Sequence, residues 1–435
     1  MFGGRTARAI GQSIEEAVQA GRVAAGDLLP PVRDLAASLD VSPATVSAAY
    51  RLLHARGLLT ADRRRGTRVR PLSNVHMRTG AVRAAPEAAT DVSSGNPDPA
   101  LLPPLASALR SIPAEPTMYG SGAELRSLAA FAKTEFAADA IDVGGVLVAG
   151  GALDAIERIL REHLRPGDRV AVEDPGFPAL IDLLSASGFA PEPVAIDAEG
   201  PTPDALDAVL ARRPAALIVT PRAQNPTGAA ISPHRATDLR AVMKRHPAPL
   251  LIENDPLGAV AGAPAVTLTA GRTHWAIVRS TSKFLGPDLR LALVAGDDLT
   301  LGRVRTRQAL GTRWVSHLLQ HLALALWSDP SSGRHLARVT ETYAHRREAL
   351  VRALAAQGIG IAATSGFNVW IPVRHEAAVV EQLAQRGWGV APGERFRLRS
   401  DPGIRVTTSA LAPADAQRFA ADLGSIVRAA APVLA

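Results

Sequence analysis

Apolar residues recur at helical spacing near the start of the chain. Within residues 5–20 they stand three or four positions apart, as on one face of a helix; they are Ala7, Ile10, Ile14 and Val18. Two further helices are expected over 32–39 and 43–56. Ser42 is a favourable N-cap, and Pro43 fits the first position of the third helix. The pattern therefore predicts three short helices.

Two short apolar stretches, 58–61 and 67–69, flank a basic cluster after the third helix. The cluster is Arg63, Arg64 and Arg65, followed by Gly66. A basic turn between two short strands, placed after a helix-turn-helix pair, is typical of a winged helix-turn-helix domain. The second helix of such a pair enters the major groove of DNA. A small helical dimerisation module is the alternative interpretation.

From Asp91 the pattern changes, and short apolar runs alternate with helical periodicity as far as about residue 300. This alternation is typical of an α/β fold with a mostly parallel central sheet. Beyond it, further helices and strands indicate a smaller α/β terminal lobe. The helices are expected near 330–356 and 375–386, and the strands near 366–373 and 403–408.

These patterns divide the chain into three parts. A winged helix-turn-helix DNA-binding domain is expected over 1–70, and a linker without clear periodicity over 71–90. A body over 91–435 follows, with a large part over about 91–325 and a terminal lobe over about 326–435.

Composition narrows the classes of function. The chain has 435 residues, 47% of them apolar and 20% charged, which suits two or three globular domains. It has no cysteine, which excludes disulfides, thiol catalysis and cysteine-ligated zinc, and we expect no metal site. No apolar run approaches the roughly 18 residues of a membrane helix. The N-terminus has no signal-peptide pattern, so we expect a cytoplasmic protein.

Charge is concentrated near the N-terminus. Residues 1–70 contain 11 arginines and 6 acidic residues, and so carry +5 of the total net charge of +7. A small basic domain attached to a nearly neutral body indicates that the basic part meets nucleic acid. Chance clustering in an arginine-rich chain is the alternative.

Lysine is almost absent from the chain, although Lys and Arg together number 48. The three lysines are Lys133, Lys244 and Lys283. Lys283 follows an apolar run at 275–278 and stands close to Ser280, Ser282 and Arg290. Unlike arginine, lysine can deprotonate and form a Schiff base with an aldehyde. We therefore expect Lys283 to hold pyridoxal 5′-phosphate, with Ser280 and Arg290 placed to receive its phosphate and Ser282 also binding the cofactor. A surface lysine after a strand is the alternative.

Other candidate groups follow other predicted strands, where open α/β sheets bind their ligands. Gly150, Gly151 and Ala152 begin a predicted helix, and the free amides of a helix N-terminus suit a phosphate. Phe177 can lie flat on an aromatic ring, although a core phenylalanine is an equally good interpretation. Asn225 can donate a hydrogen bond to a phenolate oxygen.

Two further positions complete the candidate site. Asn254 and Asp255 follow an apolar run at 249–252, where a carboxylate can pair with a pyridinium nitrogen. Neighbouring residues of a strand point to opposite faces, so only one of the two can face the ring. Arg405 lies in a strand expected in the terminal lobe, and its guanidinium suits a substrate carboxylate. A surface salt bridge is the alternative for this arginine.

The first part of the chain closely resembles the GntR-type DNA-binding domain, in the segments 29–36, 41–53, 57–59 and 65–69. The resemblance implies contacts with DNA phosphates or bases from five residues: Arg33, Ser42, Thr45, Arg64 and Arg65. In one departure, Pro43 stands where the family usually has an arginine. The base contacts at the start of the recognition helix are therefore expected to differ.

The body resembles the fold-type I aminotransferases. The motifs are Gly150-Gly151, residues 174–178, 225–228 and 280–283 with Arg290, and Arg405. Residues 94–98 and Tyr119-Gly120 also resemble that family, in which a tyrosine like Tyr119 reaches the partner subunit's phosphate. A GntR-like domain joined to such a body is the architecture of MocR-type transcriptional regulators. The resemblance implies a pyridoxal-phosphate-binding homodimer in which each N-terminal domain crosses toward the partner's body.

Two departures bear on activity. The family usually has an aspartate where Asn254 aligns, and the tyrosine that often follows is missing near Leu257. Asparagine can hydrogen-bond the pyridine nitrogen but cannot hold it protonated by charge. We therefore expect a regulator that binds double-stranded operator DNA and senses pyridoxal phosphate, an amine or an amino acid. Two alternatives stay open: an active aminotransferase, and a regulator whose body is a cofactor-free dimerisation scaffold.

Overall fold

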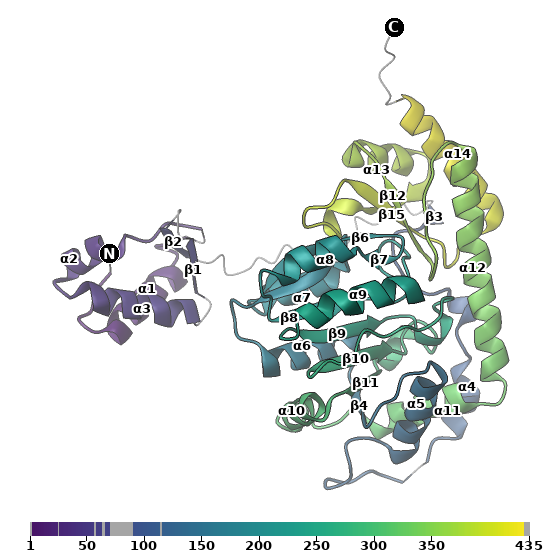
Figure 1. Cartoon of the computed structure of the whole chain (residues 1–435), viewed down its shortest axis with the longest axis horizontal. Coiled ribbons are helices and arrows are strands. Elements are labelled where there is room, and N and C mark those ends of the chain that lie inside the picture. Colours follow the sequence, from purple (N-terminus) through teal and green to yellow (C-terminus); the bar gives the residue numbers. More distant parts are fainter. Residues whose placement is uncertain are drawn as a thin grey trace.

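The computed structural model describes residues 2–24, 26–55, 58–62, 66–69, 90–113 and 115–429. The N-terminal domain contains three helices and a hairpin (Figure 1). They are α1 (Ala7–Gln19), α2 (Val32–Leu39), α3 (Pro43–Ala55), β1 (Leu59–Asp62) and β2 (Gly66–Val69). The three predicted helices and the predicted hairpin are therefore confirmed.

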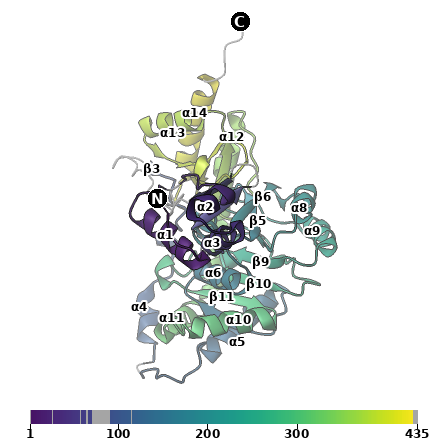
Figure 2. The ribbon, with the colours of Figure 1, turned by 90° about the vertical axis from the view of Figure 1, so that its left-hand side faces the viewer.

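The helix-turn-helix geometry is set by a few residues between α2 and α3. Asp40 ends α2 in the left-handed conformation, with φ of 50°. Ser42 begins α3, and its Oγ accepts a hydrogen bond from the Thr45 amide at 3.2 Å. Tyr50 donates from its hydroxyl to Pro30 O at 2.7 Å, which ties α3 to the segment before α2. Figure 2 shows these three helices together from another side.

The large part of the body is built on an eight-stranded sheet in the order β4-β11-β10-β9-β8-β5-β6-β7. Only β11 and β7 run antiparallel to their neighbours in it. The strands are β4 (Val146–Ala149), β11 (Ala292–Gly296), β10 (Trp275–Ser280), β9 (Leu250–Asp255), β8 (Ala216–Val219), β5 (Arg169–Asp174), β6 (Ala190–Asp197) and β7 (Gly200–Pro201). The central strands are buried on both faces, as parallel strands covered by helices are.

Helices cover both faces of this sheet. One face packs against α6 (Ala152–His163), α7 (Pro178–Ala186) and α10 (Asp298–Ala309). The other face packs against α4 (Leu105–Arg110), α5 (Arg126–Ala138), α8 (Pro203–Leu210), α9 (Pro233–Arg245) and α11 (His317–Ser328). In Figure 1, α8 and α9 lie in front of the sheet. Short 3-10 helices lie at Pro99–Leu101, Gly258–Val260, Pro287–Leu289 and Gly393–Arg395.

The terminal lobe has its own core and its own sheet, in the order β12-β15-β14. Its elements are α12 (Ser332–Ala356), β12 (Asn368–Pro372), α13 (Glu376–Gln385), β13 (Trp388–Gly389), β14 (Ala391–Pro392), β15 (Gly403–Thr407) and α14 (Pro413–Ala429). In Figures 1 and 2, α13 and α14 lie at the opposite end of the body from α5 and α10.

One strand differs from the sequence-based division. The short strand β3 (Thr90–Asp91) pairs in parallel with β13, so the body begins in the terminal lobe rather than in the large part. The Thr90 amide donates to Gly387 O and the Val92 amide to Gly389 O. A two-residue strand carries too little periodicity for a sequence pattern to reveal its partner.

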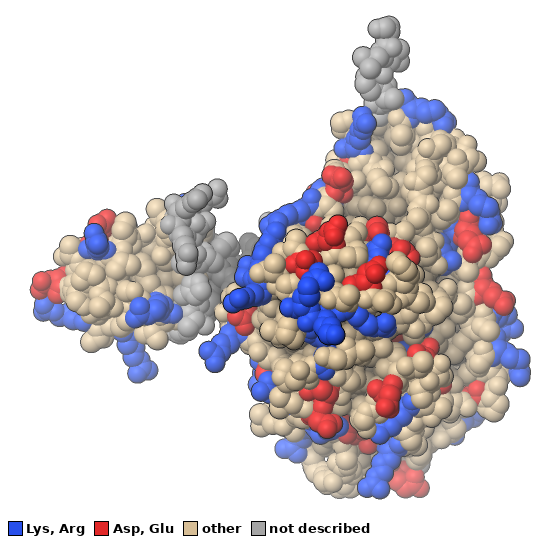
Figure 3. Space-filling model, in the orientation of Figure 1, with Lys and Arg blue, Asp and Glu red and all other residues tan. Residues whose placement is uncertain are grey.

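The surface of the body carries both signs of charge. Figure 3 shows basic and acidic side chains interspersed on the face in view, which fits the small net charge of the body. Within the described part of the chain, no helix is both long enough and apolar enough to span a bilayer.

Candidate functional site

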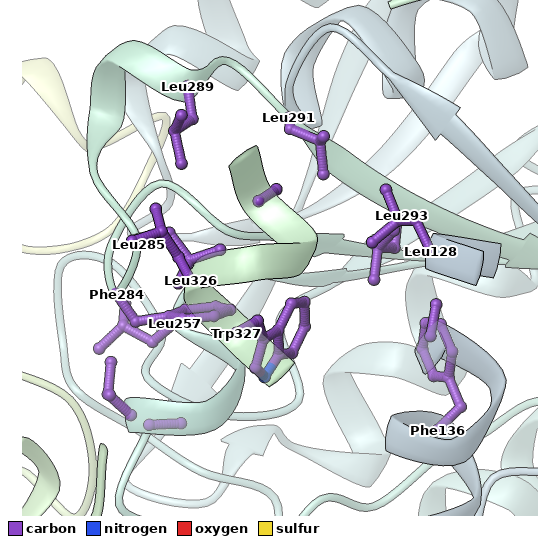
Figure 4. Packing of buried hydrophobic residues seen from close by; sticks show 14 of the residues in the cluster. Leu128, Phe136, Leu257, Phe284, Leu285, Leu289, Leu291, Leu293, Leu326 and Trp327 are labelled. Atoms are coloured by element: carbon purple, nitrogen blue, oxygen red, sulfur yellow. The ribbon is translucent and has the colours of Figure 1, made fainter. Parts of the chain in front are cut away.

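Lys283 lies just beyond β10, and the residues that follow it anchor its loop. Phe284 and Leu285 are buried in the core between the sheet and α11 (Figure 4). The rings of Phe284 and Trp327 meet edge-on, with centroids 4.7 Å apart. A side chain carried by such a loop is held in a defined place, because its neighbours fill a close-packed core.

The Lys283 amine is poised between its charged and neutral forms. Its Nζ donates a hydrogen bond to Gly95 O at 2.7 Å. Burial, and secondly the positive charge of Arg405, lower the pKa of Lys283 to about 8. Near neutral pH a useful fraction of this amine is therefore unprotonated and nucleophilic, as attack on an aldehyde requires.

At the start of α6 the structure places Arg290 against Gly151, while the Gly150 amide donates to Asp154 Oδ2 at 3.0 Å and Ser280 lies two strands away. Gly151 is the N-cap residue of α6, with φ of 109°. A Cβ atom at this position would lie 2.8 Å from Arg290 Nη2, so the guanidinium packs directly against the glycine backbone. Ser280 is in register with Ala292, and Ala292 with Ala149 on β4. Helix amides, an arginine and a serine hydroxyl are a donor set that fits a phosphate.

Neighbouring residues of β9 separate to opposite faces of the sheet. Asn254 is in register with Val278, which lies in the core beneath α6 and α7. Ser280, two residues farther along β10, shares this face. Asn254 is only 5% exposed, and its Oδ1 has no hydrogen-bond partner within the residues described. A buried amide without a partner on this face suits a ligand that has a polar group at the same position, where the two can form a hydrogen bond.

The Asp255 side chain points to the other face of the sheet. Its carboxylate accepts hydrogen bonds from Arg222 Nε at 3.1 Å and Arg279 Nε at 2.9 Å. Both arginines also pair with Asp139. Burial raises the pKa of Asp255, but the two arginines more than offset it and hold the pKa below its ordinary value. The acid next to Asn254 is thus part of a buried ion-pair network and does not face α6.

Arg405 on β15 is buried and forms contacts with neutral groups. Its guanidinium donates to Ser93 O, and to Asn225 Oδ1 at 3.2 Å, and it lies 4.9 Å from the centre of the Phe396 ring. It is 5% exposed, so the surface-salt-bridge alternative is wrong. Burial, and secondly the charge of Arg395, lower the pKa of Arg405 to about 10. A buried guanidinium bonded to neutral partners retains a strong attraction for a carboxylate.

Phe177 and Ala152 lie at the same end of the sheet. Phe177 is the N-cap residue of α7, and both side chains are partly buried against the core on the α6 face. The sequence did not reveal the role of Asp174 in this region. Its carboxylate accepts bonds from the amides of Leu398, Arg399 and Ser400, and so ties a terminal-lobe loop to the end of β5.

Tyr119 is placed apart from this cluster. Its ring is 79% exposed and packs edge-on against Trp314, with centroids 5.8 Å apart. The Arg313 guanidinium lies 5.3 Å from the centre of the same ring. Among the described residues, Tyr119 makes none of the contacts of the Lys283 cluster.

The predicted DNA-binding residues lie on α2 and at the start of α3. Arg33 is exposed on α2, and Ser42 is exposed before α3. The hydroxyls of Ser42 and Thr45 lie 2.9 Å apart, so they present adjacent polar groups at the helix N-terminus. Arg64 and Arg65, predicted in the turn of the hairpin, lie outside the described residues.

Comparison with known families supports both parts of the chain. Residues 6–69 match the family described as bacterial regulatory proteins, gntR family. Residues 86–423 match aminotransferase class I and II. A multiple substrate aminotransferase from Thermococcus profundus has the same fold, with a TM-score of 0.73 at 18% identity over 82% of this chain and 97% of its own.

Two curated relatives are transcriptional regulators by name. The chain is 40% identical over 427 residues to the vitamin B6 salvage pathway transcriptional repressor PtsJ of Salmonella typhimurium. This match covers 97% of this chain and 99% of the relative. It is 28% identical over 355 residues to the HTH-type pyridoxine biosynthesis transcriptional regulator PdxR of Corynebacterium glutamicum, over 77% of this chain and 76% of the relative.

Fold and site thus define a class, a DNA-binding transcriptional regulator whose body has the pyridoxal-phosphate-dependent aminotransferase fold. The chain belongs to the MocR-type transcriptional regulators. Pyridoxal 5′-phosphate is the cofactor of its body, and double-stranded DNA is the partner of its N-terminal domain.

Proposed function

We propose that this regulator senses pyridoxal 5′-phosphate through Lys283, and that it is a sensor rather than a metabolic enzyme. The observation that carries the proposal is the placement of Asn254 and Asp255. A neutral, unsatisfied amide shares the sheet face of Ser280 and α6, while the acid is held on the other face by Arg222 and Arg279.

The proposed roles follow from the chemistry of each side chain. Lys283 binds the aldehyde, Arg290 and Ser280 hold the phosphate with the amides of Gly151 and Ala152, and Ser282 supports them. Phe177 and Asn254 contact the ring, and Asn225 donates to its phenolate. When bound, the cofactor supplies a ring that withdraws electrons most strongly while its nitrogen is protonated. Asn254 has no charge to keep that nitrogen protonated, so the site favours binding over turnover.

The effector site is proposed at Arg405. Its buried guanidinium lies near Lys283, whose pKa it lowers, and it holds only neutral partners among the described residues. The carboxylate of an amino acid offers such a guanidinium a charged, two-point partner. We therefore infer that the body responds to pyridoxal phosphate alone or together with an amino acid.

The names of the relatives point to the target genes. One relative is called a repressor of vitamin B6 salvage and another a regulator of pyridoxine biosynthesis. A regulator that senses the end product of such pathways would close a feedback loop. We propose that this chain controls genes of vitamin B6 metabolism, in the cytoplasm where its DNA lies.

We also propose that the active form is a homodimer. Large apolar side chains are exposed around Tyr119: Met118, Leu310 and Leu318, with exposures of 67%, 80% and 58%. Tyr119 itself packs against Trp314 in the same region. Exposed apolar groups gathered on one surface mark an interface, and a dimer would place this tyrosine against the partner's cofactor site.

The direct test is a visible absorption spectrum of the purified protein with pyridoxal phosphate, before and after borohydride. Reduction is expected to fix the cofactor to Lys283, so that a peptide containing this residue gains its mass. Lys283→Ala should show neither the protein-bound absorbance nor the mass. Equal labelling of the variant would refute the assignment of Lys283.

The role of Asn254 has its own test. Asn254→Asp places a carboxylate on the proposed cofactor face and should raise the rate of the transamination half-reaction with amino acids at least tenfold. The matched control is Asp255→Glu, which keeps the acid in the network on the far face. If wild type already transaminates at the rate of an ordinary enzyme, about 1 to 10³ per second, the sensor proposal is wrong.

A further inference from the structure

We propose that residues 90–96 transmit ligand binding in the body to the DNA-binding domain. The inference rests on the proposed function, because it assigns a regulatory role to contacts of the Lys283 and Arg405 site. This stretch, called the coupling segment below, is the first described part of the chain after the N-terminal domain.

Three backbone carbonyls of the coupling segment are held by the proposed ligand site and its surroundings. Ser93 O accepts from the Arg405 guanidinium, and Gly95 O accepts from Lys283 Nζ at 2.7 Å. Asn96 O accepts from Ser409 Oγ at 2.6 Å. The two side chains best suited to bind ligands therefore hold adjacent points of one segment.

Gly95 permits this close contact. Its φ is 67°, a conformation that side chains rarely adopt. A Cβ atom at this position would lie 3.0 Å from Arg405 Nη1, so a larger residue would push the segment off the arginine. The glycine is needed because the backbone itself, and not a side chain, fills the space next to Arg405.

The other end of the coupling segment is part of the terminal lobe. Strand β3 pairs with β13, and Val92 is buried in the lobe core with 3% exposure. Val92 O also accepts from the Thr407 amide on β15 at 2.8 Å. A shift at Ser93 or Gly95 is therefore passed to β3, which is covalently continuous with the chain arriving from the DNA-binding domain.

Binding chemistry uses the same donors that hold the segment. When neutral Lys283 Nζ condenses with an aldehyde, a C=N double bond forms and the carbonyl oxygen leaves as water with both amine hydrogens. The imine nitrogen carries at most one proton, which a neighbouring phenolate would accept, so none is left for Gly95 O. A carboxylate bound by Arg405 likewise takes up guanidinium donors that now serve Ser93 O and Asn225 Oδ1.

Two ligands thus release two neighbouring contacts of one segment. Pyridoxal phosphate acts at Gly95 through Lys283, and an amino-acid carboxylate acts at Ser93 through Arg405. Each ligand should loosen the segment alone. A carboxylate without an amine, which cannot displace Lys283 from the aldehyde, should add to the effect of pyridoxal phosphate. Because the coupling is an equilibrium between two arrangements of the segment, DNA binding must in turn alter the affinity for the ligands.

The experiment is amide hydrogen exchange of the full-length protein, read in peptides that cover residues 90–96. Pyridoxal phosphate should speed exchange of the Thr90 and Val92 amides about tenfold, the order expected for loss of one hydrogen bond from a charged donor. Propionate, which has a carboxylate but no amine to displace Lys283, should add a further increase. Operator affinity is measured on the same samples with a fragment selected from random DNA.

A variant that leaves Lys283 and Arg405 intact separates coupling from binding. Ser409→Ala removes the bond to Asn96 O, and it should speed exchange about fivefold without ligand, as loss of a neutral hydrogen bond does. Ser409→Ala should also change operator affinity in the same direction, up or down, as pyridoxal phosphate changes it in wild type. The control is Ser328→Ala, whose hydroxyl donates to Leu324 O at 2.8 Å on α11; it should change neither quantity.

The outcomes distinguish this inference from the function on which it rests. If the spectrum shows no bound cofactor, both fail. If the cofactor binds and changes operator affinity while exchange in 90–96 stays constant, the inference is overturned and the proposed function stands. The inference is overturned in the same way if Ser409→Ala behaves as Ser328→Ala does.

Discussion

Asn254 and Asp255 show how two adjacent residues of one strand acquire different tasks. Asp255 balances the charge of Arg222 and Arg279. The three side chains are buried together beneath α5, and their ion pairs link the ends of β8, β9 and β10. Asn254 faces the other way and is unsatisfied within the described residues. Burial of an unpaired polar group costs stability, so its retention is best explained by a ligand that bonds to it.

The difference predicts unequal effects on stability. Asp255→Asn removes a buried charge from two arginines and should lower the free energy of unfolding by about 3 to 5 kcal/mol, the usual result of breaking a buried ion pair. Asn254→Ala removes a side chain whose Oδ1 has no hydrogen-bond partner among the described residues, and it should cost less than about 1 kcal/mol. The urea midpoint of the body transition measures both. Equal losses would contradict the opposite orientations.

The Lys283 pKa predicts a pH dependence for cofactor binding. Its value of about 8 lies below the ordinary lysine value, so the neutral amine becomes dominant above that pH. The initial rate of reaction with pyridoxal phosphate should rise about tenfold per pH unit below 8 and then level off. Stopped-flow absorbance follows this rate.

The second cause of the low pKa of Lys283 can be removed separately. Arg405→Gln takes away a positive charge that disfavours the protonated amine, so the pKa of Lys283 should rise and the plateau should move to higher pH. Arg399→Gln, a change at an exposed arginine of the same lobe, is the control. An unchanged profile in Arg405→Gln would show that burial alone sets the pKa.

Among the elements, α2 and α3 carry recognition of DNA. Ser42 and Thr45 present their hydroxyls at the N-terminus of α3, and Arg33 is exposed on α2. Pro43 begins α3 and offers no side-chain donor to a base. Sequence discrimination must therefore come from other positions of the helix and from the hairpin.

We expect Arg33 to contact a phosphate. Arg33→Gln should weaken binding to specific and random DNA alike, and should reduce the slope of log affinity against log salt concentration by about one. Fluorescence anisotropy over a salt series measures this slope. Arg8→Gln, at an exposed position of α1 outside the helix pair, should leave the slope unchanged. A loss confined to specific DNA would instead mean that Arg33 reads a base.

The sequence predicted the elements more completely than their contacts. Helical spacing located the three N-terminal helices, and strand-end motifs gave Lys283, Gly151 and Asn225 as candidate site residues, because these signals are local. It left the choice between Asn254 and Asp255 open, because that depends on Arg222, which follows β8, and on Arg279, which lies on β10. It also missed the place of β3 and the tether at Asp174, since both are long-range pairings that leave no periodic signal.

At the scale of the whole molecule, the regulator joins a DNA-binding unit to a body whose proposed ligand site lies at the strand ends of an enzyme fold. The body begins in the terminal lobe, at β3, and passes next to both Lys283 and Arg405 before it enters the large part. The proposed ligand chemistry therefore takes place next to the first described residues that follow the DNA-binding domain.

The proposed dimer predicts the effect of a surface charge. Leu310→Asp, in the exposed apolar region near Tyr119, should shift the protein from dimer toward monomer and raise the dimer dissociation constant at least tenfold. Sedimentation equilibrium measures the change. Leu299→Asp, a change at a leucine of α10 that is 47% exposed, is the matched control. A wild-type protein that stays monomeric at micromolar concentration would contradict the dimer.

The proposed sensor requires that pyridoxal phosphate bound at Lys283 alters operator binding. The decisive measurement is the operator affinity of wild type and Lys283→Ala, each with and without pyridoxal phosphate at one salt concentration. The cofactor should change the affinity of wild type at least fivefold, a typical allosteric coupling, and should leave that of Lys283→Ala unchanged. An equal response in both proteins, or no response in wild type, would contradict a sensor that acts through Lys283.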